Sequence, residues 1–247
     1  MRLVEVVGLA KRFGDRIALD GVSFTVEEGQ VMALVGSAGS GKTSCLDCLA
    51  GRTRPDGGRL IVDGREVTGA APLHMNKAGV ARADPLPALA RALTASQGVK
   101  LALLTGPTPL ARLWRSGGLG RRGRALLGQV GLTADAGRRA DGLSRLALER
   151  LAVARALALE PKLLLLDGAL GRLGGADAAA MLALIDRLRA RGLTAILAER
   201  RMPPGGDGVI DRVVALGRGV VIASGPPGRI RLDPELAAAI ASDGPAI

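Results

Sequence analysis

Short runs of apolar residues recur along this chain of 247 residues, at intervals that predict strands alternating with helices. Apolar and polar positions alternate from Arg2 to Val7 and from Gly21 to Val26, which predicts two strands with a turn near Phe13-Gly14-Asp15 between them. The continuous apolar run from Val31 to Val35 lies between two glycines. This run predicts a central strand buried on both faces.

Further elements are expected along the rest of the chain. Short continuous apolar runs predict strands, and apolar residues that recur every three or four positions predict helices. In chain order these elements are a helix at Thr43 to Ala50, a strand at Arg59 to Val62, a strand at Leu163 to Leu166, a helix at Ala178 to Arg191, a strand at Thr194 to Leu197 and strand material at Val209 to Val221. Strands and helices in this alternation predict a parallel sheet covered on both faces.

The middle of the chain has a different character. It is rich in Ala, Leu and Arg, its apolar residues recur with a helical period, and glycine pairs such as Gly117-Gly118 interrupt it. This pattern indicates a helical subdomain inserted into an α/β domain. We expect one domain with a nucleotide-binding core at 1–84 and 159–225, a helical subdomain at 85–158 and a C-terminal tail at 226–247.

Composition and charge restrict the possible partners and the compartment of this chain, but they do not identify its function. Aromatic residues make up 1% of the chain, which argues against base-stacking surfaces and makes nucleic acid an unlikely partner. The net charge of +11 suits an anionic partner, either nucleic acid or the inner face of a membrane, and a coding bias toward Arg explains it equally well. The absence of a long apolar run, of a secretory signal and of a disulfide framework predicts a cytosolic chain.

A phosphate-binding motif carries the strongest functional signal. Residues 36–43 match the pattern G-x-x-x-x-G-K-[ST] and lie between a predicted buried strand and a predicted helix. Backbone N–H groups in such a loop surround phosphates, and the helix dipole adds positive potential. Lys42 is expected to reach the β- and γ-phosphates. The expected nucleotide-binding residues of this segment are Gly36, Ser37, Ala38, Gly39, Ser40, Gly41, Lys42, Thr43 and Ser44.

The loop also needs a carboxylate that helps to hold Mg²⁺ together with the Thr43 hydroxyl. The apolar run Leu163 to Leu166 ends in Asp167, at the carboxyl end of a predicted strand. An Asp after an apolar run is common on its own, but here it accompanies a complete phosphate loop. We therefore expect Thr43 and Asp167 to be the metal ligands.

Four segments resemble, in the same order, the ATP-binding subunits of ABC transporters, and most closely those of branched-chain amino acid uptake. They are KRFGDRIALDGVSFTVEEGQVMALVGSAGSGKTS, AGRTRPDGGRLIVDGREVTG, LSRLALERLAVARALALEPKLLLLD and GRGVVIASGPPGRIRLDPEL. The resemblance covers nearly the whole chain. It implies a P-loop NTPase fold with a RecA-like parallel sheet core, N-terminal antiparallel strands and an inserted helical subdomain.

The resemblance also implies cofactors and partners. ATP and Mg²⁺ are the expected cofactors, and Phe13 is expected to stack on adenine. The expected partners are a homologous ATP-binding subunit or a second copy, and transmembrane permease subunits on which the helical subdomain docks at the inner face of the membrane. No direct solute binding is expected. A basic cluster either belongs to that docking surface or is a solvated face; it comprises Arg112, Arg115, Arg121, Arg122 and Arg124, with Trp114.

Four positions depart from the family's pattern. Pro85 stands where relatives carry a Gln that senses the γ-phosphate, and Gln97 is too far downstream to replace it. Gly168 stands where relatives carry the Glu that polarises the attacking water, and Arg200 replaces a phosphate-contacting His. In the signature segment 143–147, Leu146 replaces the Gly that approaches the γ-phosphate of the opposite subunit, while Ser144 keeps a hydroxyl that can donate one hydrogen bond.

All four departures lie at positions that act in ATP hydrolysis in the resembled family. We therefore expect an ATP-binding subunit of an importer of branched-chain or related amino acids, in which ATP hydrolysis is strongly impaired or absent. No catalytic residue is assigned. Two alternatives stay open: a non-catalytic, ATP-responsive binding or regulatory module acting off the membrane, and a decayed paralogue without a present role.

Overall fold

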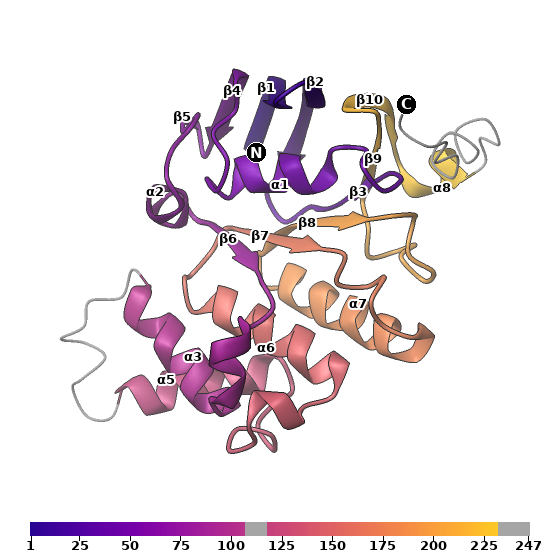
Figure 1. Ribbon diagram of the computed structural model, residues 1–247. Helices are drawn as coiled ribbons and strands as arrows, with labels where there is room; N and C mark the ends of the chain where they lie inside the picture. Colours follow the sequence, from indigo (N-terminus) through magenta and orange to yellow (C-terminus); the bar gives the residue numbers. More distant parts are fainter. Residues whose placement is uncertain (107–117, 232–247) are drawn as a thin grey trace.

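The computed structural model describes residues 1–106 and 118–231, which form two sheets with helices around them (Figure 1). An antiparallel sheet has the strand order β2-β1-β4-β5, and a six-stranded sheet has the order β10-β9-β3-β8-β7-β6. The strands are β1 (Arg2–Phe13), β2 (Arg16–Glu27), β3 (Val31–Val35), β4 (Gly57–Val62), β5 (Arg65–Glu66), β6 (Val80–Ala83), β7 (Leu163–Asp167), β8 (Thr194–Glu199), β9 (Arg212–Gly217) and β10 (Val220–Gly225).

The helices connect these strands and cover the larger sheet. They are α1 (Lys42–Leu49), α2 (Pro72–Lys77), α3 (Ala95–Thr105), α5 (Gly118–Gln129), α6 (Arg145–Leu157), α7 (Gly175–Arg189) and α8 (Pro227–Arg231), with short 3₁₀ turns η1 (Ala88–Ala92) and η3 (Ala140–Gly142). Among the residues that the structure describes, no helix has the length and apolar character needed to cross a bilayer.

Strand β3 has the central position that its apolar run predicts. It pairs in parallel with β8 on one side and β9 on the other, and all five of its residues are buried. Because successive side chains point to opposite faces, Val31, Ala33 and Val35 enter one core while Met32 and Leu34 enter the other. The predicted strand buried on both faces is confirmed.

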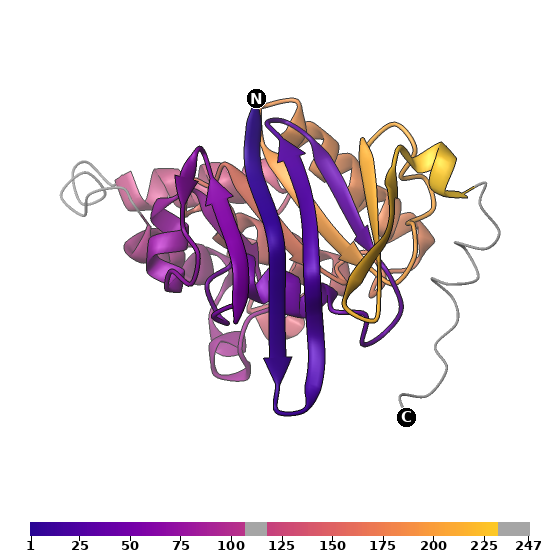
Figure 2. The same cartoon turned by 90° about the horizontal axis from the view of Figure 1, so that it is seen from above.

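Each face of the six-stranded sheet has its own cover. Helix α1 lies between the two sheets, where Cys45, Leu46 and Leu49 pack with the inner face of the antiparallel sheet in one core (Figure 1). Helices α3, α5, α6 and α7 contribute to the core on the opposite face. The α/β class with a parallel sheet and N-terminal antiparallel strands is therefore confirmed. Seen from above, β1 and β2 form one long hairpin across the molecule (Figure 2).

Several elements differ from the sequence-based expectation. The first two strands extend to Phe13 and begin again at Arg16, beyond the alternating segments, because register shifts in their pairing break the two-residue pattern. The pattern analysis did not predict β5, α2 or β6. Strand β6 is only four residues long and contains Arg82, so it lacks the continuous apolar run that identified its neighbour β7.

The segment proposed as a helical subdomain contributes α3, α5 and α6. Helix α3 begins with a capping box, in which the Thr94 hydroxyl accepts from the Gln97 N–H and the Gln97 amide oxygen accepts from the Thr94 N–H. Gln97 is thus occupied at the start of α3. Of the basic cluster, Arg121, Arg122 and Arg124 lie on α5, whereas Arg112, Trp114 and Arg115 lie outside the described residues.

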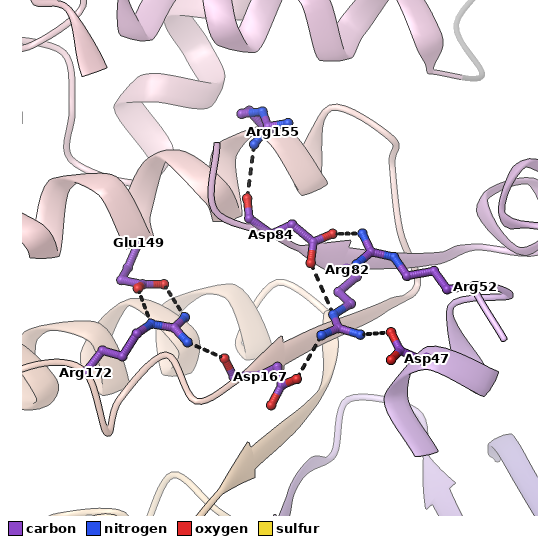
Figure 3. Close-up of polar contacts among 8 residues, drawn as sticks. All are labelled: Asp47, Arg52, Arg82, Asp84, Glu149, Arg155, Asp167 and Arg172. Atoms are coloured by element: carbon purple, nitrogen blue, oxygen red, sulfur yellow. Dashed lines mark hydrogen bonds and ion pairs between the residues drawn. The ribbon is translucent and has the colours of Figure 1, made fainter. Parts of the chain in front are cut away.

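Two polar contacts join α6 to loops of the core (Figure 3). Arg172, in the loop after β7, forms a bidentate ion pair with Glu149 on α6, with Nε to Oε1 at 2.8 Å and Nη2 to Oε2 at 3.1 Å. Arg155 on α6 donates to the Asp84 carbonyl at 3.0 Å. Since the Glu149 side chain is only 9% exposed, its ionised carboxylate depends on Arg172 for compensation.

We predict that Glu149 and Arg172 are energetically coupled. In a double-mutant cycle with Glu149→Gln and Arg172→Gln, followed by urea unfolding, the coupling should be about 1–3 kcal/mol, because removing either partner leaves the other partly buried and unmatched. The control cycle is Arg139→Gln with Asp141→Asn, a pair whose side chains are 60% and 48% exposed and whose coupling should be weaker because water screens it. Equal coupling in the two cycles would contradict this interpretation.

Close packing requires a glycine at position 41, directly before α1. Its φ of 104° lies in the left-handed region, and a Cβ at this position would lie 2.4 Å from the Ala18 carbonyl oxygen. Gly64 also has a positive φ of 71°, but nothing lies within 4 Å of its Cβ position. A side chain at either glycine would strain the backbone, but only at Gly41 would it also overlap with neighbouring atoms.

Accordingly, Gly41→Ala should destabilise the chain more than Gly64→Ala. Backbone strain alone costs about 1–3 kcal/mol and applies to both variants, whereas the overlap with Ala18 should add about 1–3 kcal/mol for Gly41 alone. Urea unfolding of the two variants measures the difference. Equal losses would show that the loop moves away from β2 without cost.

Candidate functional site

A cavity of about 860 Å³ lies at the carboxyl ends of β7 and β8, next to the start of α1. Parallel pairing brings these strand ends to one edge of the sheet, so the loops that follow them meet there. The phosphate loop contributes Ala38, Gly39, Gly41, Lys42, Thr43 and Ser44 to the wall. The loops after β7 and β8 contribute Asp167, Gly168 and Arg200, so sites separated by more than 120 positions share one cavity.

Lys42 is held inside the phosphate loop. Its ammonium donates to the Gly36 carbonyl at 2.6 Å, the Ser37 carbonyl at 2.5 Å and the Ser40 hydroxyl at 3.0 Å. These bonds place a buried positive charge at the N-terminus of α1, beside the cavity. A lysine beside the backbone N–H groups of a helix start is an arrangement suited to phosphate oxygens.

Asp167 is already engaged by a cation. Arg82 Nη2 donates to its Oδ2 at 2.8 Å, and the same guanidinium contacts Asp47 at 2.5 Å and Asp84 at 3.2 Å (Figure 3). Arg52 forms a further ion pair with Asp84. The Arg82 side chain is 10% exposed, so these carboxylates from three separate elements hold it in place.

The residues around the phosphate loop do not fit a firmly held Mg²⁺. The expected ligands are the Thr43 hydroxyl, which lines the cavity, and the Asp167 carboxylate, which shares its charge with Arg82. Gly168 and Pro85 supply no side-chain oxygen where the family pattern has a carboxylate and an amide.

Arg172 fills the space beside Gly168. Its Nη1 donates to the Asp167 carbonyl at 2.8 Å and lies 3.2 Å from the position that a Gly168 Cβ would take. Gly168 has a φ of 61°, a conformation that a residue with a side chain adopts only with strain. The hydrogen bond that Arg172 donates to the Glu149 carboxylate raises the pKa of Arg172, so the guanidinium stays charged. A cation therefore lies directly beside Gly168 at the end of β7.

Glu199 is a cavity residue to which the sequence analysis assigned no role. It ends β8, and its two carboxylate oxygens accept from the Leu170 N–H at 2.7 Å and the Gly171 N–H at 3.1 Å. Burial raises the pKa of Glu199, although the two N–H donors oppose that shift. The contact fixes the loop after β7 against β8. The signal in the sequence was a carboxylate at the end of an otherwise apolar strand.

Three exposed arginines complete the wall. Arg200 and Arg201 follow β8, and Arg16 reaches the cavity from the start of β2. Within the described ranges, none of the three has an ion pair to a carboxylate. Arg200 thus lies where the sequence analysis placed it, with its guanidinium available to an anion.

Other expected site residues lie away from this cavity. Phe13 lies at the end of β1 with its side chain 51% exposed, and Lys11 Nζ is 5.4 Å from its ring centroid. Pro85 follows β6 at the surface. Ser144 caps α6, with its hydroxyl accepting from the Ala147 N–H at 3.2 Å, and Leu146 is partly buried in the first turn of that helix.

Comparisons with known proteins agree with this architecture. The model of the ABC transporter family matches residues 19–171. The chain is 32% identical to the branched-chain amino acid transport ATP-binding protein BraF of Pseudomonas aeruginosa and 30% identical to LivG of Salmonella typhimurium, and each match covers 95% of both chains. A nucleotide-free ATP-binding cassette from an ABC transporter superimposes with a TM-score of 0.88 at 23% identity, over 99% of this chain and 100% of that one.

Members of this family bind ATP, generally with Mg²⁺, dimerise and work with transmembrane permeases. The phosphate loop and the start of α1 form part of the cavity wall, an arrangement suited to the phosphates of a nucleotide. The chain therefore belongs to the ABC transporter family, as a subunit of the ATP-binding type.

Proposed function

We propose that this chain is the ATP-binding subunit of an amino acid importer and that it binds ATP while hydrolysing it poorly or not at all. The observation that carries the proposal is the shared cavity, in which an intact phosphate loop faces Gly168, Arg172 and Arg200. ATP binding rests on the loop and Lys42. The proposed loss of hydrolysis rests on these three residues, which are expected to lie near the γ-phosphate.

The impaired hydrolysis has a physical basis in the missing base. A general base contributes about 10²–10⁴-fold to a rate, and Gly168 has no side chain to supply one. Glu199 does not replace it, because both of its oxygens accept backbone N–H groups of the loop after β7. Arg200 can bind a phosphate, but it does not release a proton near neutral pH.

The amino acid as transported solute is proposed from the relatives' names. BraF and LivG are branched-chain amino acid transport proteins, and each aligns along 95% of this chain. Solute specificity would reside in the permease and its receptor. We place the chain in the cytoplasm, peripheral at the inner face of the membrane.

A permease is proposed to dock between the core and the helical segment. A groove of about 350 Å³ there is lined by α2, β6, α3 and α6, and the Leu101 side chain on its wall is 54% exposed. Leu73 on α2 is also exposed. Apolar side chains beside a groove are typical of a protein interface. We keep residues 85–158 as the proposed extent of the helical subdomain.

The dimer is proposed to be formed with a homologous subunit or with a second copy. In the family's arrangement, each nucleotide lies between the phosphate loop of one subunit and the signature segment of the other. This chain would then impair its own site through Gly168 and Arg200, and its partner's site through Leu146. A homodimer should be nearly inactive.

Lys42→Ala should abolish ATP binding. The unmutated chain should bind with a dissociation constant in the micromolar range, about −8 kcal/mol, and loss of the buried ammonium should remove measurable heat in calorimetry. Lys77→Ala, an exposed lysine on α2, is the matched control for the loss of one positive charge and should bind normally. Absence of heat with the unmutated chain would refute ATP binding.

Gly168→Glu should not restore hydrolysis. The new side chain would need the left-handed backbone of Gly168 and the space that Arg172 Nη1 occupies, while Pro85, Leu146 and Arg200 would remain. A phosphate-release assay should therefore show no turnover above that of the same variant carrying Lys42→Ala, which measures contaminating activity. Turnover above that background would show that the missing carboxylate is the only defect.

A further inference from the structure

The wall of the nucleotide cavity carries an excess of positive charge. Its cationic residues come from separate segments and are Arg16, Lys42, Arg172, Arg200 and Arg201. Its acidic residues are Asp167 and Glu199, and both already have partners: Arg82 binds the first, and two backbone N–H groups bind the second. The wall thus offers several cations to an anion and little free negative charge to a cation.

Among these cations, Arg172 is held in a fixed position at the edge of the sheet where the phosphates are expected. Two of its nitrogens bind Glu149 and its Nη1 binds the Asp167 carbonyl, so its guanidinium is fixed at the end of β7 (Figure 3). It occupies the region beside Gly168 and Asp167, next to the expected metal ligand. A fixed guanidinium at this point repels a divalent cation and attracts phosphate oxygens.

Arg200 offers a second guanidinium, directly after the carboxyl end of the neighbouring strand β8. It lines the same cavity, is exposed, and has no carboxylate partner in the described ranges. Charge-assisted hydrogen bonds from arginine to phosphate are among the stronger polar contacts in proteins, and their planar geometry suits two oxygens at once. Each of the two arginines brings one positive charge to the cavity wall; Glu149 pairs with that of Arg172, whereas Arg200 has no carboxylate partner in the described ranges.

We propose that this site takes the nucleoside triphosphate as the metal-free anion, with Arg172 and Arg200 supplying the positive charge that Mg²⁺ supplies in relatives. The inference deepens the proposed ATP binding and depends on it. It accounts for the ion pair between Asp167 and Arg82, which leaves less negative charge on that carboxylate for a metal ion. It also gives the departures at Gly168 and Arg200 one shared effect. The first removes a negative charge that the family pattern has, the second adds a positive charge, and both make the cavity more positive.

Calorimetric titration with ATP tests the proposal, in buffer containing Mg²⁺ and in buffer containing EDTA. The dissociation constant in EDTA should be no more than about threefold weaker than in Mg²⁺. A weakening beyond about threefold would overturn metal-free binding while leaving ATP binding intact. Absence of binding in both buffers would instead refute the proposed function, so the two failures are distinguishable.

Variants test the two arginines. Arg200→Gln should weaken binding in EDTA by about tenfold and weaken binding in Mg²⁺ less, because the ion then replaces the lost charge. Arg172→Gln should act in the same direction, and Arg200→Gln remains decisive if loss of the Glu149 pair unfolds that variant. The control is Arg187→Gln with Arg191→Gln, two exposed arginines at and beyond the end of α7, which should change neither constant. Equal losses in both buffers for Arg200→Gln would overturn the assignment.

Discussion

The parallel pairing of β3 with β8, and of β8 with β7, is the constraint on which the site depends. These strands are buried on both faces, so their register is fixed by two cores at once. Their carboxyl ends therefore meet at one edge of the sheet. The phosphate loop, the loop that begins at Asp167 and the loop that begins at Arg200 each leave a strand at that edge, and the cavity forms where they meet.

Beside this edge of the sheet, the acidic side chains are paired within the protein and most of the described basic ones are not. Asp167 and Glu199, the two acids on the cavity wall, are both bonded within the protein, whereas Arg200, Arg201 and Arg16 have no carboxylate partner within the described ranges. Arg172 brings a further cation and is held there by Glu149 from α6. The result is a cavity wall whose charge attracts anions.

The residues proposed to bind the nucleotide and those on which the proposed loss of hydrolysis rests lie in separate parts of the structure. Lys42 and the backbone of the phosphate loop form one unit with α1, and their geometry does not involve the residues after β7. Gly168, Arg172 and Arg200 lie on the loops that follow β7 and β8 and line the same cavity. A chain can retain the first unit while it loses the chemistry of the second, and this is the basis for proposing ATP binding without turnover.

The sequence alone determined the buried central strand, the phosphate loop and the strand-terminal Asp167, because each is a local pattern with its own physical cause: continuous apolar residues, glycines before a lysine, and a polar residue at a strand end. It also located Gly168 and Arg200 by their departure from the family's pattern. Only the tertiary structure decided that Arg82 binds Asp167, that Glu149 holds Arg172 beside Gly168, and that Glu199 binds the loop after β7. Those contacts join residues between 23 and 85 positions apart. No local pattern encodes them, since they arise only when strand pairing and helix packing bring the side chains together.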